Sequence, residues 1–185
     1  MSQSLTVARI EAERVVLRKA QESDRERLIE LRTDPDVGAY IGGHQDRAAV
    51  EQRIAEVGMV KLGDVPGLFI IADKATDVFL GTMQLMPRAA DQPAHLAESG
   101  DELEIGYTLH RSAWGAGYAF EAAAAILRAG AAELADQPVI LITQSANTRS
   151  RRLADRLGFR FVRTFHAYDA EQTLSAADLH TFLTA

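Results

Sequence analysis

The order of the predicted strands and helices constrains the fold of this chain more than any other feature of its sequence. Alternating apolar residues predict strands at 14–18, 68–72, 78–86, 102–109, 139–143 and 160–166. Two helices are predicted between the first two strands, and one helix before each of the last two. This order predicts a mixed α+β sheet with helices on its faces. The sequence has no internal repeat or linker, so we expect one domain, residues 1–185, long enough to bury a core.

Capping and stop signals predict where the helices begin and end. Ser23-Asp-Arg-Glu26 has the pattern of a capping box, and Asp34-Pro35 stops the helix that it opens. A second helix is expected from about Arg47. Asn147 is expected to cap the fourth helix, and Gly158-Phe159 to end it as a Schellman motif.

Two segments show no strong pattern. Residues 87–101 contain Pro, Gly, Ser and Asp without an apolar period, which predicts a mobile loop. The tail predicts a weak strand over residues 168–174 and then a helix from Ser175.

Composition excludes several classes of function. The chain has no cysteine, which excludes disulfides, thiolate metal sites and cysteine nucleophiles, and its five scattered histidines form no metal-binding pair. A formal net charge of −6 argues against a nucleic-acid partner. No apolar run reaches the roughly 18 residues that span a bilayer, and the polar N-terminus is not a secretion signal. We therefore expect a cytoplasmic protein with no metal and no membrane partner.

Gly115 and Gly117 stand one residue apart, directly before an alanine-rich helix predicted over residues 117–135. A P-loop is excluded because its Lys-Ser or Lys-Thr is missing, and Phe120 occupies the third glycine position of a dinucleotide-binding turn. Two alternatives remain. One is an anion cradle built from the free amides of residues 115–119, and the other is a helix start whose residues are small only to allow close packing. A helix dipole contributes at most about 2 kcal/mol, while micromolar binding needs about 8 kcal/mol. A ligand of such a cradle must therefore be long and make further contacts.

Four motifs occur in a fixed order: Glu104-Ile-Gly-Tyr107, Trp114-Gly-Ala-Gly-Tyr-Ala119, Asn147-Thr-Arg-Ser150 and Leu157-Gly-Phe159. Together they resemble the GNAT superfamily of N-acetyltransferases, and within it the branch that acetylates N-terminal amines of ribosomal proteins. The resemblance implies a mostly antiparallel central sheet flanked by helices, in which the strand of Glu104 and the strand 139–143 splay apart to form an acyl-CoA cleft.

The resemblance also implies acetyl-CoA as the co-substrate. Its diphosphate would lie on Trp114, Gly115, Ala116, Gly117, Tyr118 and Ala119. Its pantetheine arm would pair with the backbone of the splayed strand at Ile105 and Tyr107, and with the side chain of Asn147. Tyr107 itself is expected to be wall or core. Arg149 and Arg152 would attract the phosphates; the alternative is a solvated helix face. His110 and Arg111 could reach a phosphate too, although a turn at the strand exit explains both.

Two residues are the candidates for catalysis. Ala154 stands where many relatives have a proton-donating tyrosine, and the ribosomal-protein branch suggests Ser150 as the replacement. The alternative for Ser150 is a role in satisfying the amides of the helix start. Glu104 is the candidate base, directly or through water, with a solvated strand face as the alternative. Glu102 shares its face of the strand.

We expect an N-acetyltransferase that moves an acetyl group from acetyl-CoA to a primary amine, either a protein N-terminus or a small molecule. Without cysteine, direct attack in a ternary complex is expected. The acceptor pocket should be framed by residues 34–44, 87–101 and the tail, and either stand open or be completed by the partner subunit of a homodimer. The alternative function is a non-catalytic acyl-CoA-binding or sensing module.

Overall fold

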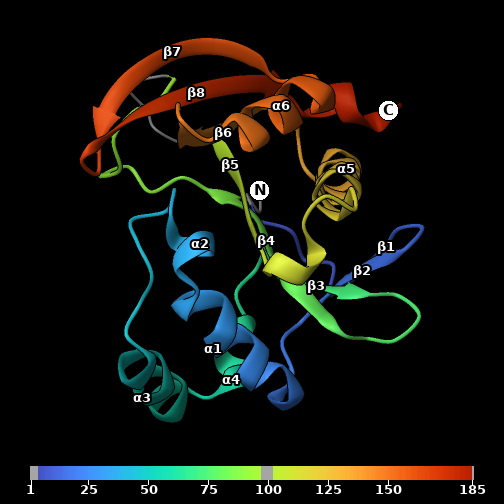
Figure 1. Ribbon diagram of the computed structural model, residues 1–185. Coiled ribbons are helices and arrows are strands. Elements are labelled where there is room, and N and C mark those ends of the chain that lie inside the picture. The colour runs from blue at the N-terminus through green and yellow to red at the C-terminus, as the bar shows by residue number, and fades with distance from the viewer. Residues whose placement is uncertain (1–3, 97–101, 185) are drawn as a thin grey trace.

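The computed structural model describes residues 4–96 and 102–184, and over this part of the chain one eight-stranded sheet carries helices on both faces (Figure 1). The strands are β1 Arg9–Glu11, β2 Val15–Arg18, β3 Leu68–Asp73, β4 Phe79–Pro87, β5 Leu103–Leu109, β6 Pro138–Gln144, β7 Arg160–Ala167 and β8 Ala170–Asp178. The helices are α1 Arg25–Thr33, α2 Pro35–Gly38, α3 Arg47–Val57, α4 Met59–Gly63, α5 Tyr118–Glu133 and α6 Thr148–Leu157. Short 3-10 turns are η1 Glu22–Asp24, η2 Arg111–Ala113 and η3 Leu179–Leu183.

The sheet has the order β1-β2-β3-β4-β5-β6-β8-β7, and every neighbouring pair is antiparallel except β5 and β6. These two parallel strands are in register only at Leu103–Val139 and Glu104–Ile140. Beyond these two pairs the strands separate, while β5 stays paired with β4 along its whole length. The α+β fold class and the splayed strands expected from the resemblance are confirmed.

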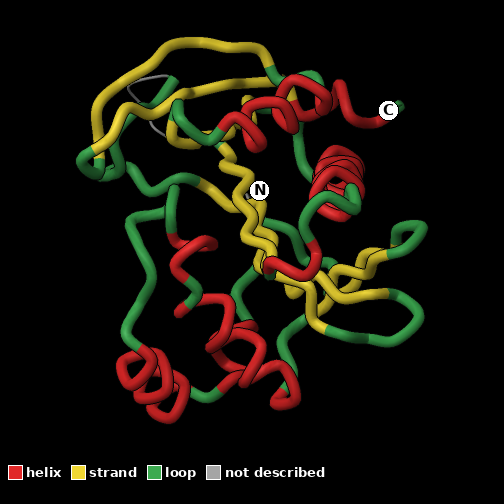
Figure 2. The backbone as a smooth tube through the Cα atoms, in the orientation of Figure 1, coloured by secondary structure: helices red, strands yellow, loops and turns green. Residues whose placement is uncertain are grey.

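The alternation of β5 turns one set of its side chains toward the larger of two hydrophobic cores. Leu103, Ile105 and Leu109 face α5 and belong to the larger hydrophobic cluster, and Tyr107 packs against its edge. On this side Gly130 lets α5 approach the sheet, because a Cβ there would lie only 2.7 Å from Leu85 Cδ2. The second cluster lies under α1, α3 and α4 on the other face. Strands therefore separate two groups of helices (Figure 2).

The C-terminal tail differs from its prediction. Residue Ser175 lies inside β8, paired with both Leu141 and Phe161, so the helix predicted from Ser175 is wrong. β7 and β8 form a clear hairpin whose turn residues, Tyr168 and Asp169, have φ of 53° and 59°. The Thr-, Ser- and Ala-rich sequence of β8 has no strong strand pattern, and its two flanking strands provide the pairing that makes it extended.

Most predicted helix ends are confirmed, with one shift. The Gly158 and Phe159 amides donate to the Asp155 and Ala154 carbonyls, both at 3.0 Å, which is the Schellman arrangement. α3 begins at Arg47 as predicted. The capping box at the first helix, however, is formed by Gln21 and Asp24 around η1 and does not involve Ser23 and Glu26.

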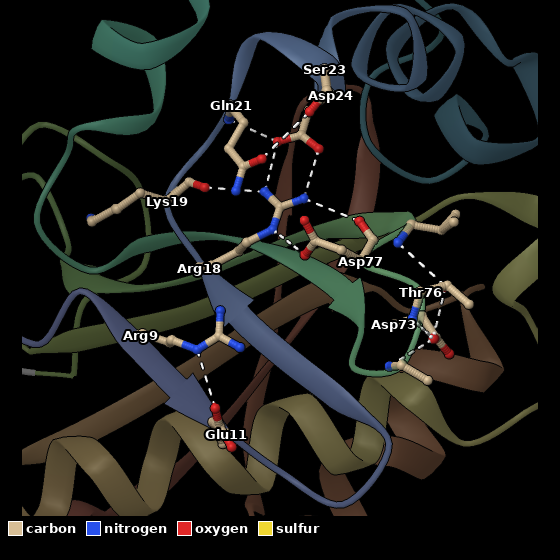
Figure 3. Close-up of polar contacts among 12 residues, drawn as sticks. Arg9, Glu11, Arg18, Lys19, Gln21, Ser23, Asp24, Asp73, Thr76 and Asp77 are labelled. Carbon is tan, nitrogen blue, oxygen red and sulfur yellow. Dashed lines mark hydrogen bonds and ion pairs between the residues drawn. The ribbon is translucent and has the colours of Figure 1, made fainter.

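The α1 end of the fold is fixed by a buried arginine (Figure 3). Arg18, 4% exposed, donates to both carboxylate oxygens of Asp24 at 2.8 and 2.9 Å, and its Nε donates to Asp77 at 2.7 Å. The hydrogen bond with Asp24 raises the pKa of Arg18 further above its usual range. This contact ties the start of α1 to the turn between β3 and β4.

Candidate active site

A cavity of about 470 Å³ lies where β5 and β6 separate. It is lined from both sides of the sheet, by the segment around α2, by β5, and by the first residues of α5 and α6. Its lining residues are Asp36, Val37, Ala39, Tyr40, Ile41, Tyr107, Thr108, Leu109, Trp114, Gly115, Ala119, Asn147, Thr148, Arg149, Ser150 and Leu153. Six of the predicted cofactor-binding residues, and Ser150, are therefore brought together here. The segment 34–44 frames the cavity as expected, whereas no residue of the 88–96 segment lines it.

Gly115 and Gly117 are glycines because the backbone requires it. Their φ values are +77° and +83°, a region that residues with a Cβ rarely adopt. A Cβ on Gly115 would meet no protein atom within 4 Å, so the position also leaves open space above the loop.

The backbone N–H groups of residues 115–119 make no hydrogen bond of ordinary geometry with another described residue. The first α5 amide bonded to a carbonyl is that of Glu121, which donates to Gly117 O at 3.1 Å. Gly115, Ala116 and Gly117 are exposed. The loop therefore presents a row of unpaired donors at the positive end of the longest helix.

Arg14 binds the backbone of the loop 115–117, a role that the sequence patterns did not predict. Its Nη1 donates to the Ala116 carbonyl at 3.0 Å, and its Nε donates to Glu121 at 2.8 Å. Its guanidinium also lies 4.9 Å from the centre of the Tyr118 ring. Glu121 in turn accepts from the Arg14 and Val15 amides. Arg14 and Glu121 are 107 residues apart in the sequence. Their opposite charges were the only sequence signal that could have suggested this ion pair.

Arg149 lies beside the loop, and Arg152 does not. The indole N–H of Trp114 donates to Leu109 O at 2.9 Å, and the Arg149 guanidinium lies 5.3 Å from the centre of that ring. Both side chains line the cavity. Arg152 is exposed on α6 and does not line it. Arg149 is therefore the cation placed to meet an anion on the loop.

Two other predicted phosphate contacts are engaged elsewhere. Arg111 Nη1 lies 2.6 Å from Asp36 Oδ2, and His110 caps η2 and contacts Glu30 at 3.2 Å. Neither residue lines the cavity. These contacts favour the alternative that His110 and Arg111 form the turn at the exit of β5, and they attach η2 to α1 and α2.

The start of α6 brings a serine and a tyrosine together. Asn147 Oδ1 accepts from the Ser150 amide at 3.2 Å, which confirms Asn147 as the N-cap. The Ser150 hydroxyl itself lies 2.6 Å from the Tyr107 hydroxyl. Burial raises the pKa of Tyr107, and the hydrogen bond to Ser150 opposes that rise only in part. Tyr107 is part of the wall as expected, but its hydroxyl is also joined to the candidate acid, a contact that sequence reasoning missed.

Glu104 lies on the opposite face of β5 and does not line the cavity. Its Oε2 is 2.5 Å from Nη1 of Arg88, a side chain that is only 4% exposed, and Arg88 also donates to Pro93 O at 2.5 Å. The structure therefore places the candidate base in an ion pair that anchors the segment after β4.

Glu102 anchors the same segment. Its carboxylate accepts from the Leu96 amide and lies 3.2 Å from His95 Nδ1. Burial raises the pKa of Glu102, but these hydrogen bonds outweigh it and hold the pKa below its usual range. Residues 88–96 are thus fastened by side chains where a mobile loop was expected, and the expectation for 97–101 lies outside the described residues.

Within the described ranges, no three histidine, cysteine or acidic side chains are grouped so as to hold a metal ion. No helix in these ranges is long and apolar enough to cross a membrane.

Comparison with known proteins places the chain in a family. A family model described as an acetyltransferase (GNAT) domain matches residues 14–160. The uncharacterized protein YkkB of Bacillus subtilis is 30% identical over 158 residues, 85% of this chain and 88% of that protein. The uncharacterized N-acetyltransferase p20 of Bacillus licheniformis is 31% identical over 150 residues, 80% of each chain.

Solved structures show the same fold. A GNAT-family acetyltransferase from Bacillus anthracis has a TM-score of 0.73 at 24% identity, over 92% of this chain and 98% of that one. Spermidine N-acetyltransferase from Vibrio cholerae, in complex with CoA and spermine, has a TM-score of 0.69 at 13% identity, over 92% and 98% of the chains. The ribosomal L7/L12 alpha-N-protein acetyltransferase RimL, in complex with CoA, has a TM-score of 0.70 at 14% identity, over 93% and 98%. The chain belongs to the GNAT family and is an acetyl-CoA-dependent acetyltransferase.

Proposed function

We propose that this protein transfers the acetyl group of acetyl-CoA to a primary amine, a protein N-terminus or a small molecule, by direct attack within a ternary complex. The observation that carries the proposal is the row of unpaired amides at residues 115–119, which opens into the cavity between β5 and β6. The structural neighbours named above, spermidine N-acetyltransferase and RimL, support an amine as the acceptor.

The chain's residues fit the co-substrate. The amides of residues 115–119, with Arg149 beside them, would hold the diphosphate, since backbone N–H groups at a helix start favour anions. From Ile105 onward, the β5 edge that faces β6 pairs with no strand in the described part of the chain, so its backbone is free to pair with an extended arm. The NH2 group of Asn147, which no described residue engages, lies at the same cavity. These contacts are the additional ones that a long ligand needs, because a helix dipole alone is too weak to bind it.

Acetyl-CoA supplies an acyl group on a thiol, and the departing thiolate needs a proton at neutral pH because a free thiol has a pKa near ~8.5. We assign proton donation to the Ser150 hydroxyl, which lines the cavity. Tyr107 is a positioning residue: its hydroxyl, 2.6 Å away, holds the Ser150 hydroxyl in place.

For Glu104 we propose proton acceptance through water, on the face of β5 that carries α1 and α2. The alternative is that Glu104 only anchors residues 88–96 through Arg88. Glu104→Gln and Arg88→Met separate the two roles, because only the first removes the carboxylate while both break the ion pair. If Glu104 is the base, kcat falls in Glu104→Gln alone. If Glu104 is only an anchor, kcat falls equally in Glu104→Gln and Arg88→Met.

The experiment that tests the function measures thiol release from acetyl-CoA with N-terminal peptides and polyamines, together with calorimetric binding of acetyl-CoA. We expect turnover above background for at least one amine, and loss of acetyl-CoA affinity in Gly117→Glu, which places a like charge on the diphosphate site. Binding without turnover across the panel would favour the sensing module. Unchanged affinity in Gly117→Glu would contradict the site itself.

A further inference from the structure

A second cavity lies between the sheet and the helices α1, α3 and α4, and it shares no lining residue with the active-site cavity. Its volume is about 320 Å³, at the small end of the range for ligand pockets. Its apolar wall is formed by Ala20, Leu28, Val50, Ile54, Met59, Leu62, Leu68, Phe69 and Ile70. Its polar side chains are Arg32, Gln45, Arg53 and Thr82, so the cavity carries two positive charges and no negative one.

Among the described residues, neither arginine has a partner of opposite charge. Arg32 on α1 is half-buried and Arg53 on α3 is exposed, and neither guanidinium makes an ion pair or hydrogen bond with another described residue. Arg18, close to the same helices, is by contrast neutralised by Asp24 and Asp77. Burial and the neighbouring charge of Arg53 lower the pKa of Arg32. Two neighbouring cations that line one largely apolar cavity are electrostatically unfavourable without an anion between them.

We propose that this cavity binds a small organic carboxylate, with its carboxylate between Arg32 and Arg53 and a short aliphatic body against the apolar wall. A guanidinium matches a carboxylate in geometry and can donate two parallel hydrogen bonds to it. The chain as a whole has a net charge of −6, so anion binding here comes from this local pair and not from the general field of the protein.

The test is calorimetric titration of the protein, without acetyl-CoA, with hexanoate, 1-hexanol, hexylamine and hexyl phosphate. We expect saturable binding of hexanoate, at least tenfold weaker binding of hexanol, and none of hexylamine. Arg32→Met and Arg53→Met should each weaken hexanoate binding at least tenfold. Hexanoate should also shift the NMR signals of the Leu28, Ile54 and Met59 methyl groups.

Two matched variants serve as controls. Arg25→Met changes a partly exposed α1 arginine that pairs with Glu22, and Arg149→Met removes the cation of the acetyl-CoA cavity; both should leave hexanoate binding unchanged. Neither Arg32→Met nor Arg53→Met should lower Tm, because neither guanidinium makes an ion pair or hydrogen bond with another described residue and methionine keeps most of the apolar stem. Arg53 is exposed, so Arg53→Met remains informative even if the Arg32 variant folds poorly.

The proposal is overturned if hexanoate does not bind, if hexanol binds equally well, or if only hexyl phosphate binds. It is also overturned if the loss occurs in Arg149→Met and not in the Arg32 and Arg53 variants. The readout is binding without acetyl-CoA, so failure here leaves the proposed acetyl transfer untouched.

Discussion

The hydrogen bond between the Tyr107 and Ser150 hydroxyls offers a sharp test of the proposed proton donor. Tyr107→Phe removes only the phenolic oxygen and keeps the ring against the larger core, and Ser150→Ala removes the other partner. A neutral hydrogen bond contributes about 1 kcal/mol net, which corresponds to roughly a fivefold change in rate. General-acid catalysis contributes about 10²-fold or more.

We therefore expect kcat to fall about fivefold in Tyr107→Phe and at least about 10²-fold in Ser150→Ala. If Tyr107 acts only by holding Ser150, then adding Tyr107→Phe to Ser150→Ala should cost nothing further. The cycle would then show a coupling of about 1 kcal/mol. Burial raises the pKa of Tyr107 above its usual value near 10, so its hydroxyl should stay protonated and the effect should persist at pH 9.

The assay is steady-state thiol release at saturating acetyl-CoA, with Tm measured for each variant. Equal losses from Tyr107→Phe in both backgrounds would refute the linkage between the two hydroxyls. A Ser150→Ala enzyme that keeps kcat would show that Ser150 serves only the helix start.

Three further outcomes follow from the structure. Gly117→Ala and Gly158→Ala each place a Cβ on a residue with positive φ, so each should lower the free energy of unfolding in urea by about 1–2 kcal/mol. Only Gly117→Ala should weaken acetyl-CoA binding. Equal acetyl-CoA affinities of the two variants would contradict the role of the loop. Arg18→Met leaves Asp24 buried without its cation and should cost about 3–5 kcal/mol; a loss below about 1 kcal/mol would mean that the pair is not desolvated as we infer. Because the native protein lowers the pKa of Glu102, the ionised carboxylate stabilises the fold fully above the ordinary carboxyl pKa of about 4.3, and this stabilisation is lost as pH falls through the pKa of the folded state. Glu102→Gln should therefore make the decrease of Tm at acid pH less steep. An unchanged decrease of Tm with pH would contradict this.

The parts of the site that could be predicted from the sequence are local ones. Gly115 and Gly117 before an alanine-rich helix report a backbone requirement that adjacent residues alone impose, and φ at both is positive. Asn147 and Gly158 likewise mark the two ends of α6 by interactions within a single turn. The splay of β5 and β6 came from the family resemblance, since no pattern within either strand states where pairing stops.

Contacts between distant residues were beyond sequence patterns. Tyr107 meets Ser150 across 43 positions, and Arg88 reaches Glu104 because the end of β4 lies antiparallel to the start of β5. Glu104 illustrates the difficulty: its place on the strand was predicted correctly, but its partner decides what its carboxylate can do. β8 is the corresponding case in the fold, since its extended form depends on β6 and β7.

The most direct test of the cofactor site is an NMR titration of the 15N-labelled protein with CoA, following the backbone amides of residues 115–119. These amides have no hydrogen-bond partner among the described residues, so CoA should shift their proton signals downfield and slow their exchange with solvent. The Gly158 amide, which is bonded within its helix cap, is the internal control and should not move. If CoA binds while the signals of residues 115–119 stay unchanged, the diphosphate lies elsewhere and the proposed site is wrong.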